Sequence, residues 1–265
     1  DLSDPISIYR IILEVKPDEI YNEADQDHVS WSYDMVGYSA DITASAPARI
    51  LEIIYRSDKN IKYFQPCTSN MFGETEETPQ NENTRFNPMS PYACAKASAY
   101  YFTRYYRKSL GLFASTAIMY NHESPRRTEE YVTRKISKTV ARIHLGLAEK
   151  IELGDISAEI DWGYSKEYME AAHTILQLEN PDDFIIATGE SHSVKEFLEE
   201  AFNFVGLVYK NYLKTNSKFF RPSKTSVLVG DISKAKKTFN FSPKIKFKDL
   251  VKLMVEEDIK KLSAS

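Results

Sequence analysis

A tyrosine and a lysine four residues apart, Tyr92 and Lys96, lie in the alanine-rich stretch SPYACAKASAYY. On a helix, positions i and i+4 share one face, so the two side chains would project together. An ammonium group beside a phenol favours the phenolate and lowers the pKa of the tyrosine. Such a phenolate is a base for a sugar or alcohol hydroxyl whose carbon loses a hydride. The alternative is a solvated lysine next to a half-buried tyrosine, because both residues are common on helices.

A hydroxyl group that could assist this tyrosine precedes it by one loop. The residues CTSN begin at the last position of an apolar, β-prone stretch, 61–67, and place Thr68 and Ser69 where an α/β sheet presents side chains to its ligand cleft. A hydroxyl there could bond the substrate group that the tyrosine deprotonates. The alternative is ordinary turn chemistry, in which serine and threonine hydroxyls bond their own backbone.

The elements that must position these residues alternate between strands and helices. A strand at 61–67 leads into a polar, proline-containing loop, 73–91, followed by a helix over 91–110 and a strand over 112–120. The other expected elements are a helix from Asp4 or Ser7 to Pro17, a strand through Tyr21, a mostly helical stretch 31–58, a helix 128–146 capped by Gly146, a strand 184–189, a helix 193–206 with a Ser193–Glu196 capping box, and a helix 247–262. This alternation predicts an α/β fold with a parallel sheet covered on both faces.

Composition excludes several classes of protein. The formal charge of −4 and the pI near 5.8 argue against a nucleic-acid-binding protein. Two cysteines, Cys67 and Cys94, are too few for a disulfide framework, so we expect the reducing cytoplasm. No apolar run reaches the roughly 20 residues of a membrane span, and the polar opening is not typical of a signal peptide. Because no methionine begins the chain, we expect its true beginning to be missing.

Longer stretches carry a specific resemblance. Thr68, Tyr92 and Lys96, in this order on the expected elements, resemble the catalytic set of the extended short-chain dehydrogenase/reductase superfamily. The stretch NHESPRRTEEYVTRKISKTVARIHLG, 121–146, closely resembles the signature of the GDP-mannose 4,6-dehydratase family. Further agreement, in EIYN, DWGYSKEYMEA, FIIATGESHSVKEF, FFRP and LVGDISKAKK, extends it over essentially the whole chain.

This resemblance implies a fold and an activity. The fold would be a Rossmann-like doubly wound parallel sheet with a smaller C-terminal substrate-binding lobe, the NADP-binding part at 1–120 and most of the nucleotide-sugar-binding part at 121–265. Family members bind NADP(H), need no metal, and convert GDP-mannose to GDP-4-keto-6-deoxymannose by oxidation at carbon 4, elimination of water across carbons 5 and 6, and reduction. They associate through helices, so we expect a homodimer or homotetramer, with no nucleic-acid or membrane partner.

The resemblance also assigns residues to roles. Tyr92 would take the proton of the sugar 4-hydroxyl, Lys96 would tune Tyr92 and bond the nicotinamide ribose, and Thr68 matches the family's threonine. The remaining cofactor contacts carried over by position are Asp1, Leu2, Gln26, Tyr38, His122 and Arg127, and the substrate contacts are Asn121, Lys135 and Arg221.

Several positions depart from the family pattern. Where the family has the glutamate that acts as base at carbon 5, this chain has Asn70, and a neutral amide does not accept that proton. The family's K-R-D-W-G arginine is replaced by Ile160. Carboxylates stand at Glu23, Asp25 and Asp27 in a loop that is small and neutral in the family, where they would repel cofactor phosphates unless they point away.

No glycine-rich phosphate-binding turn is found in the sequence, so we expect the first β-α-β unit of the nucleotide fold to be absent. Two alternatives to an active GDP-mannose dehydratase remain open at this point. One is another nucleotide-sugar epimerase or dehydratase, which Thr68, Tyr92 and Lys96 would serve equally well. The other is a pseudoenzyme retained as an oligomerisation or regulatory partner, which Asn70 favours.

Overall fold

A parallel four-stranded sheet forms the centre of the first of two compact units in the computed structural model, which describes residues 1–216 and 226–264. The first unit comprises 1–119, 169–186 and 231–241, and the second comprises 120–168, 187–230 and 242–265. The strand order is β1-β2-β3-β8, with bounds β1 Glu19–Tyr21, β2 Lys62–Thr68, β3 Ala114–Met119 and β8 Asp183–Ile186. This architecture confirms the predicted α/β fold with a parallel sheet.

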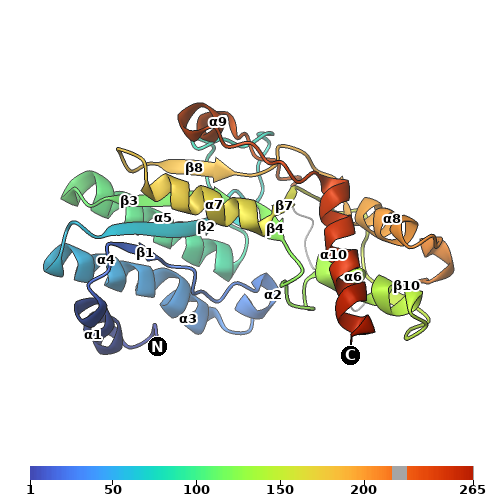
Figure 1. The fold of residues 1–265 in the computed structure, drawn as a ribbon. Helices are drawn as coiled ribbons and strands as arrows, with labels where there is room; N and C mark the ends of the chain where they lie inside the picture. Colours follow the sequence, from blue (N-terminus) through green and yellow to red (C-terminus); the bar gives the residue numbers. More distant parts are fainter. Residues whose placement is uncertain (217–225, 265) are drawn as a thin grey trace. The chain divides into compact units, whose positions relative to one another are not determined.

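Helices cover both faces of this sheet, as expected for a doubly wound fold (Figure 1). In the view of Figure 1, α7 crosses in front of the strands and α5 lies behind them. The helices of this unit are α1 Pro5–Val15, α2 Val29–Ser32, α3 Val36–Ser39, the π-helical turn η1 Ala40–Ser45, α4 Ala46–Ser57, the 3₁₀ turn η2 Ser69–Met71, α5 Pro91–Leu110, α9 Ser233–Phe239 and most of α7 Ser165–Leu176.

Local sequence explains where these helices begin and end. Asp4 caps α1 by accepting a hydrogen bond from the backbone of Ile6, and Ser90 caps α5 in the same way from Ala93. Proline follows each cap at the first helical position, where its fixed φ is tolerated. Gly111 ends α5 in the left-handed region with φ 73°.

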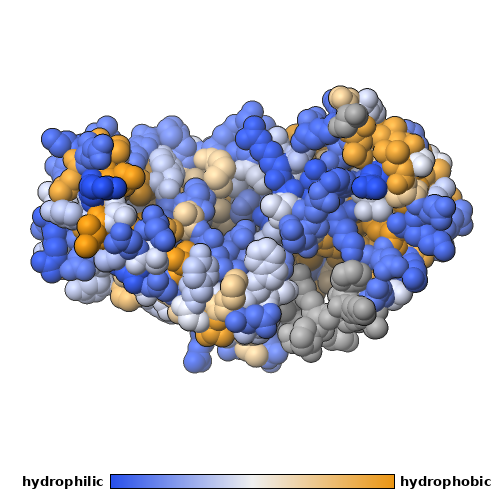
Figure 2. All heavy atoms as spheres, turned by 90° about the horizontal axis from the view of Figure 1, so that it is seen from below, coloured by the Kyte–Doolittle hydropathy of each residue, from blue (hydrophilic) through white to orange (hydrophobic). Residues whose placement is uncertain are grey.

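An apolar core joins α1, α4 and the sheet. Its buried members are Ile8, Ile12, Ile50, Leu51, Ile54, Ile61, Tyr63, Leu112 and Ala114. Three other apolar side chains of α1, those of Ile6, Ile11 and Val15, are exposed. Orange side chains gather at the left of Figure 2, the side on which α1 lies in Figure 1.

A buried ion pair also fixes α5 to the sheet. The guanidinium of Arg107 pairs with the carboxylate of Asp183 on β8 and donates a hydrogen bond of 2.8 Å to the Ala114 carbonyl. The hydroxyls of Thr116 and Tyr100 also donate to Asp183, at 2.7 and 3.2 Å. Three side-chain donors, from Arg107, Thr116 and Tyr100, therefore converge on one buried carboxylate.

Arg107→Met is expected to lower the free energy of unfolding of the first unit by about 3–5 kcal/mol, because it leaves the buried Asp183 charge without its partner. Urea titration followed by circular dichroism measures this loss. Arg104→Met is the matched control, since Arg104 is exposed on the same helix and donates only to the Tyr100 hydroxyl, at 3.2 Å. Its effect is expected to stay within about 1 kcal/mol. Equal losses in the two variants would contradict the assigned role of Arg107.

In the part of the second unit that the structure describes, three helices accompany three small two-stranded sheets. The helices are α6 Val132–His144, α8 Val194–Phe204 and α10 Phe247–Ser263, with the 3₁₀ turn η3 Tyr209–Asn211. The two-stranded sheets pair β4 Asn121–Glu123 with β7 Trp162–Tyr164, β5 Ile151–Leu153 with β10 Leu213–Thr215, and β6 Glu159–Ile160 with β9 His192–Ser193. The predicted capping box of Ser193 and Glu196 is present at the start of α8.

The three helices share a core and a buried polar contact. Ile136, Phe197 and Met254, from α6, α8 and α10, are all fully buried. Arg134 of α6 forms an ion pair with Asp258 of α10, and the Ser137 hydroxyl donates to the same carboxylate at 2.7 Å. Among the residues that the structure describes, no helix is long and apolar enough to span a bilayer.

Candidate active site

Thr68 ends β2 at the carboxyl edge of the sheet, and its hydroxyl oxygen is held from one side by Asn70. The backbone N–H and the side-chain amide of Asn70 both donate to Thr68 Oγ1, at 3.2 and 3.1 Å. The backbone of Thr68 is extended, and its side chain caps the 3₁₀ turn that follows. Because the oxygen accepts both bonds, the hydroxyl proton is left to point elsewhere.

Tyr92 and Lys96 project from the first two turns of α5, as their spacing predicts. Both are buried, with exposed fractions of 8% and 4%. The buried neighbours Ala93, Ala95 and Ala97 are small and allow the helix to pack closely on β2 and β3. The Lys96 ammonium lies 5.8 Å from the centre of the Tyr92 ring. The pair is therefore a buried unit at the sheet edge, unlike a solvated lysine beside a half-buried tyrosine.

Lys96 is held by two acceptors from neighbouring strands and loops. Its Nζ donates to the Pro66 carbonyl of β2 at 2.9 Å and forms an ion pair with Asp25 Oδ2 at 2.5 Å. The Asp25 side chain is 9% exposed, and its other oxygen accepts a hydrogen bond from the Thr43 hydroxyl. An ammonium group has three N–H bonds, so these two partners leave one for a further acceptor.

The electrostatics of this cluster keep Tyr92 neutral. Burial raises the pKa of Tyr92 to about 12; Lys96 and a hydrogen bond from Thr68 oppose this rise, whereas the charges of Asp25 and Asp27 add to it. Burial favours the neutral amine of Lys96, but Tyr92 and Asp25 outweigh it and raise the pKa of Lys96. Around neutral pH, the site thus contains a phenol, an ammonium and a carboxylate.

The position of Asp25 bears on one expectation from the sequence. Carboxylates in this loop are expected to repel cofactor phosphates unless they point away, and the Asp25 carboxylate is directed at Lys96. The role of Asp25 was missed because it depends on which strands are neighbours. Asp25 lies four residues beyond the end of β1, and β1 pairs with β2, whose carboxyl end carries Pro66 and Thr68. That pairing brings the β1 loop to the lysine.

The other cofactor contacts expected in the first unit differ in their exposure. Gln26 is buried, and its amide donates to the His28 carbonyl at 3.1 Å and accepts from the Ser39 hydroxyl at 2.9 Å. Tyr38 is exposed on α3. The carboxylate of Asp1 accepts from Ser3, and the Leu2 carbonyl accepts a hydrogen bond from Arg49 at 3.2 Å. Gln26 is thus fixed by internal bonds, whereas Tyr38 presents its ring to solvent.

The expected contacts Asn121 and His122 lie on β4 in the second unit. They pair in register with Trp162 and Gly163 of β7. The His122 ring lies 2.9 Å from the Tyr120 carbonyl through Nδ1 and packs against Tyr168 with ring centres 5.0 Å apart. Glycine is required at 163, because a Cβ there would lie 2.3 Å from the Tyr168 ring.

Arg127 and Lys135 follow β4 along the chain. The Arg127 guanidinium stacks on Tyr131, 3.4 Å from the ring centre, and lies 3.6 Å from the buried carboxylate of Glu123. Lys135 is half-buried on α6, and this burial lowers its pKa against the opposing effect of Glu152. The third expected substrate contact, Arg221, lies outside the described residues.

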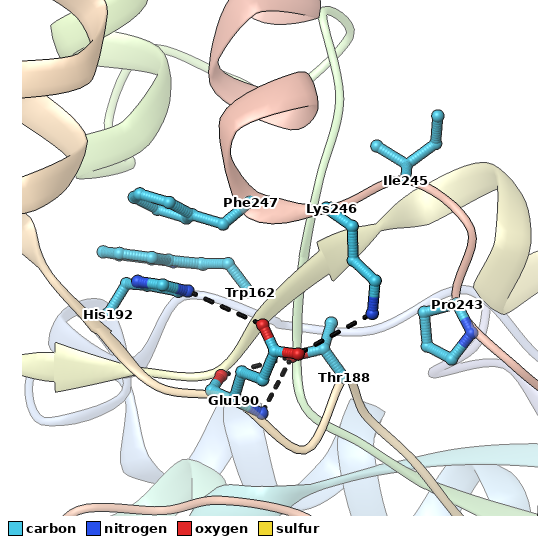
Figure 3. Close-up of a pocket in the computed structure, with 8 residues that line it drawn as sticks. All are labelled: Trp162, Thr188, Glu190, His192, Pro243, Ile245, Lys246 and Phe247. Carbon is cyan, nitrogen blue, oxygen red and sulfur yellow. Dashed lines mark hydrogen bonds and ion pairs between the residues drawn. The ribbon is translucent and has the colours of Figure 1, made fainter.

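A small cavity in the second unit is lined by aromatic and charged side chains, and Figure 3 shows them. The His192 ring stacks on Phe247 at 3.8 Å, and Phe247 stacks on Trp162 at 6.2 Å. Glu190 lies between His192 and Lys246, at 4.0 and 3.7 Å. The cavity volume is about 10 Å³, so it has room for about one water molecule and not for a nucleotide.

The donor set at the sheet edge fits the nicotinamide ribose of a dinucleotide. The resemblance implies that Lys96 bonds the nicotinamide ribose, and Lys96 has one N–H beyond those directed at Asp25 and Pro66 that could donate to a ribose hydroxyl. The Thr68 hydroxyl and the Tyr92 phenol are next to it for the substrate hydroxyl. The fit is therefore to a dinucleotide and an alcohol substrate together.

Comparison with known proteins identifies the relatives of this chain. The family model described as GDP-mannose 4,6 dehydratase matches residues 1–254. GDP-mannose 4,6 dehydratase 1 of Arabidopsis thaliana is 46% identical over 263 residues, which cover 98% of this chain and 73% of the relative. The human GDP-mannose 4,6 dehydratase is 41% identical over 278 residues, covering 98% and 75%.

Solved structures share the fold at lower identity. RMD from Pseudomonas aeruginosa, in complex with NADPH, superposes with a TM-score of 0.90 at 18% identity, covering 98% of this chain and 87% of that one. UDP-glucose 4-epimerase from Thermotoga maritima, with UDP-glucose, gives a TM-score of 0.87 at 21% identity, covering 100% and 84%. These likenesses support the Rossmann-like fold.

Proposed function

The chain belongs to the GDP-mannose 4,6-dehydratase family, and we propose from this that it catalyses the reaction of that family. Its substrate is GDP-mannose, its product is GDP-4-keto-6-deoxymannose, and its cofactor is NADP. The observation that carries the proposal is the assembly of Thr68, Tyr92 and Lys96 into one buried cluster within a chain 46% identical to a named dehydratase. The same three residues would serve an epimerase, so the choice of GDP-mannose depends on the family.

Tyr92 acts as the base for the sugar hydroxyl at carbon 4. The phenol first gives its own proton to bulk water, and the phenolate, which the adjacent Lys96 ammonium stabilises, then takes the proton of the sugar hydroxyl. The Thr68 hydroxyl donates a hydrogen bond to the same oxygen, because its lone pairs already accept from Asn70. The burial of all three side chains excludes water, which strengthens these interactions.

NADP, when bound, supplies the hydride acceptance and return that this overall conversion requires. Lys96 would hold its ribose, and Tyr38, His122 and Arg127 are the candidates for the remaining contacts. Asn121, Lys135 and Arg221 are the candidates for GDP-mannose, the first two lying at β4 and on α6. Arginine and lysine suit the diphosphate oxygens because their hydrogen bonds to it are charge-assisted.

Asn70 limits the elimination step. Its side-chain amide donates to Thr68, and an amide has no basic site for the carbon-5 proton. Losing a positioned general base costs on the order of 10²- to 10⁴-fold in rate. The proposed enzyme is therefore slow, because the elimination half of its reaction lacks a positioned base.

The second candidate function is that of a partner protein without catalytic activity. Two observations favour it: Asn70 replaces the base, and Asp25 forms an ion pair with the catalytic lysine, Lys96. In that role the chain would associate through α4 and α5, whose surface exposes Tyr101, Phe102 and Tyr105. Self-association as a homodimer or homotetramer is part of both proposals. Both proposals also include a cytoplasmic location, because Cys67 and Cys94 are both free thiols.

Mass spectrometry of nucleotide sugars incubated with the chain and NADP tests the proposed function. We expect slow loss of one water molecule from GDP-mannose and none from UDP-glucose or dTDP-glucose. Turnover of a uridine or thymidine sugar instead would assign the chain to another nucleotide-sugar enzyme. No turnover of any of the three, in the chain and in Asn70→Glu alike, would favour the silent partner.

A further inference from the structure

The carboxylate of Asp25 is the closest charged neighbour of the catalytic lysine. Its Oδ2 lies 2.5 Å from Lys96 Nζ, while the Tyr92 ring centre lies 5.8 Å from the same nitrogen. Both members of the ion pair are nearly excluded from solvent, with side chains 5% and 9% exposed. Little water is present to screen this pair, so its charges act strongly on whatever lies beside them.

Asp25 is held in this place by a second contact. Its other carboxylate oxygen accepts from the Thr43 hydroxyl, which comes from the π-helical turn η1. Thr43 is buried, so this contact is also sheltered from solvent. The carboxylate is thus directed at Lys96 from a fixed position and is not a mobile surface charge.

The charges around Tyr92 and Lys96 oppose one another. The groups that face Tyr92 are Lys96, Asp25, Thr68 and Asp27, and those that face Lys96 are Tyr92, Asp25, Cys67 and Glu23. An ammonium group stabilises the phenolate of a nearby tyrosine only as far as its charge is not compensated. A carboxylate in direct contact with that ammonium cancels much of its field at the phenol. Of these groups, Asp25 is the one whose contact with Lys96 is both direct and oppositely charged.

We propose that Asp25 is a positioning residue that binds the Lys96 ammonium and screens it from Tyr92, which makes the buried Tyr92 phenol harder to ionise and moves the oxidation step to higher pH. This inference rests on the proposed role of Tyr92 as base. Asp25 is in contact with Lys96, and it acts on Tyr92 mainly by compensating the charge of that ammonium group, an effect to which its own negative charge adds. Its removal should therefore change the ionisation of Tyr92 without removing a reacting group.

The test is a pH titration of the chain with ¹³Cζ-labelled tyrosine, followed by NMR without cofactor or substrate, in which Tyr92→Phe assigns the Tyr92 signal. In the unmodified chain, the Tyr92 signal is expected to remain that of a phenol through pH 10, consistent with its pKa of about 12. In Asp25→Asn, which removes the charge but keeps the shape, the pKa of Tyr92 should fall by about one to three units.

Two controls separate this screening from general effects of the loop. Asp27→Asn removes the same charge two residues away. Of the groups that shift the Tyr92 pKa, Asp27 has the smallest effect, so this variant should shift that pKa by less than about half a unit. Asp25→Glu retains a carboxylate and should keep the Tyr92 pKa close to that of the unmodified chain. An equal shift in Asp27→Asn and Asp25→Asn would overturn the proposal.

The unmodified chain provides a test that does not depend on the folding of a variant. A Tyr92 phenolate already formed below pH 8 would overturn the proposal, as would an unchanged or higher Tyr92 pKa in Asp25→Asn. Where the chain turns over GDP-mannose, the limb of its pH profile along which kcat rises with pH should also move to lower pH in Asp25→Asn. The NMR titration needs no turnover. A chain that is inactive towards GDP-mannose would therefore contradict the proposed function, while the titration would still measure the effect of Asp25 on Tyr92.

Discussion

Tyr92→Phe is expected to lower kcat for GDP-mannose by about 10²- to 10⁴-fold, the range that a positioned general base contributes. The substitution removes only the phenol oxygen. Lys96 favours the ionised form of this oxygen through its charge, and Thr68 does so through a hydrogen bond. The ring remains and keeps the buried packing of α5 against the sheet. The rate of product formation at saturating substrate measures the loss, and circular dichroism shows that the fold is retained.

Tyr101→Phe is the matched control for this prediction. Tyr101 lies on the same helix, and its side chain is exposed, so losing its hydroxyl should leave kcat within about twofold of the unmodified chain. Similar losses in both variants would show that helix packing was disturbed rather than the chemistry. An unchanged rate in Tyr92→Phe would remove Tyr92 from the reaction.

Asn70→Glu is expected to raise the rate of product formation by about 10²-fold or more, because it introduces a carboxylate where the carbon-5 proton must be taken. The position is suitable, since Asn70 is half-buried in the turn directly after β2 and contacts Thr68. The carboxylate cannot donate to Thr68 as the amide does, so the Thr68 hydroxyl gains a second possible acceptor. The gain is measured with the same assay.

Asn70→Gln separates basicity from size in this experiment. Glutamine has the length of glutamate and no basic group, so this variant should show no gain. A gain of equal size with glutamine would mean that space, and not a base, limits the reaction. No gain with glutamate would locate the limiting step elsewhere, in agreement with Lys96 being held by Asp25.

Patterns that are local in sequence predicted much of the first unit. The helix over 91–110 is confirmed to the residue, because a Ser-Pro start and a glycine end are both local signals. The strand at 61–67 and the polar loop after it are confirmed to within one residue at the strand ends. The stretch 31–58 is helical over most of its length, although a π-helical turn interrupts it at Ala40–Ser45.

Contacts between distant segments could not be predicted in the same way. The ion pair of Asp25 with Lys96 joins positions 71 residues apart and exists because β1 and β2 are neighbours in the sheet. The second unit combines three separate segments through strands of two or three residues, which carry too few side chains for a periodic pattern. Helix α7, Ser165–Leu176, was likewise not predicted, although its buried Ala171, Ala172 and Ile175 share one face.

The most direct test of the central claim is a ¹H NMR time course of the unmodified chain with GDP-mannose and NADP. Slow growth of a methyl doublet from the 6-deoxy sugar is expected in the unmodified chain, and Tyr92→Phe should abolish it. A methyl signal that grows equally fast in Tyr92→Phe would contradict it. So would the lack of any methyl signal in both the unmodified chain and Asn70→Glu, because the buried cluster of Thr68, Tyr92 and Lys96 would then catalyse no dehydration of this substrate.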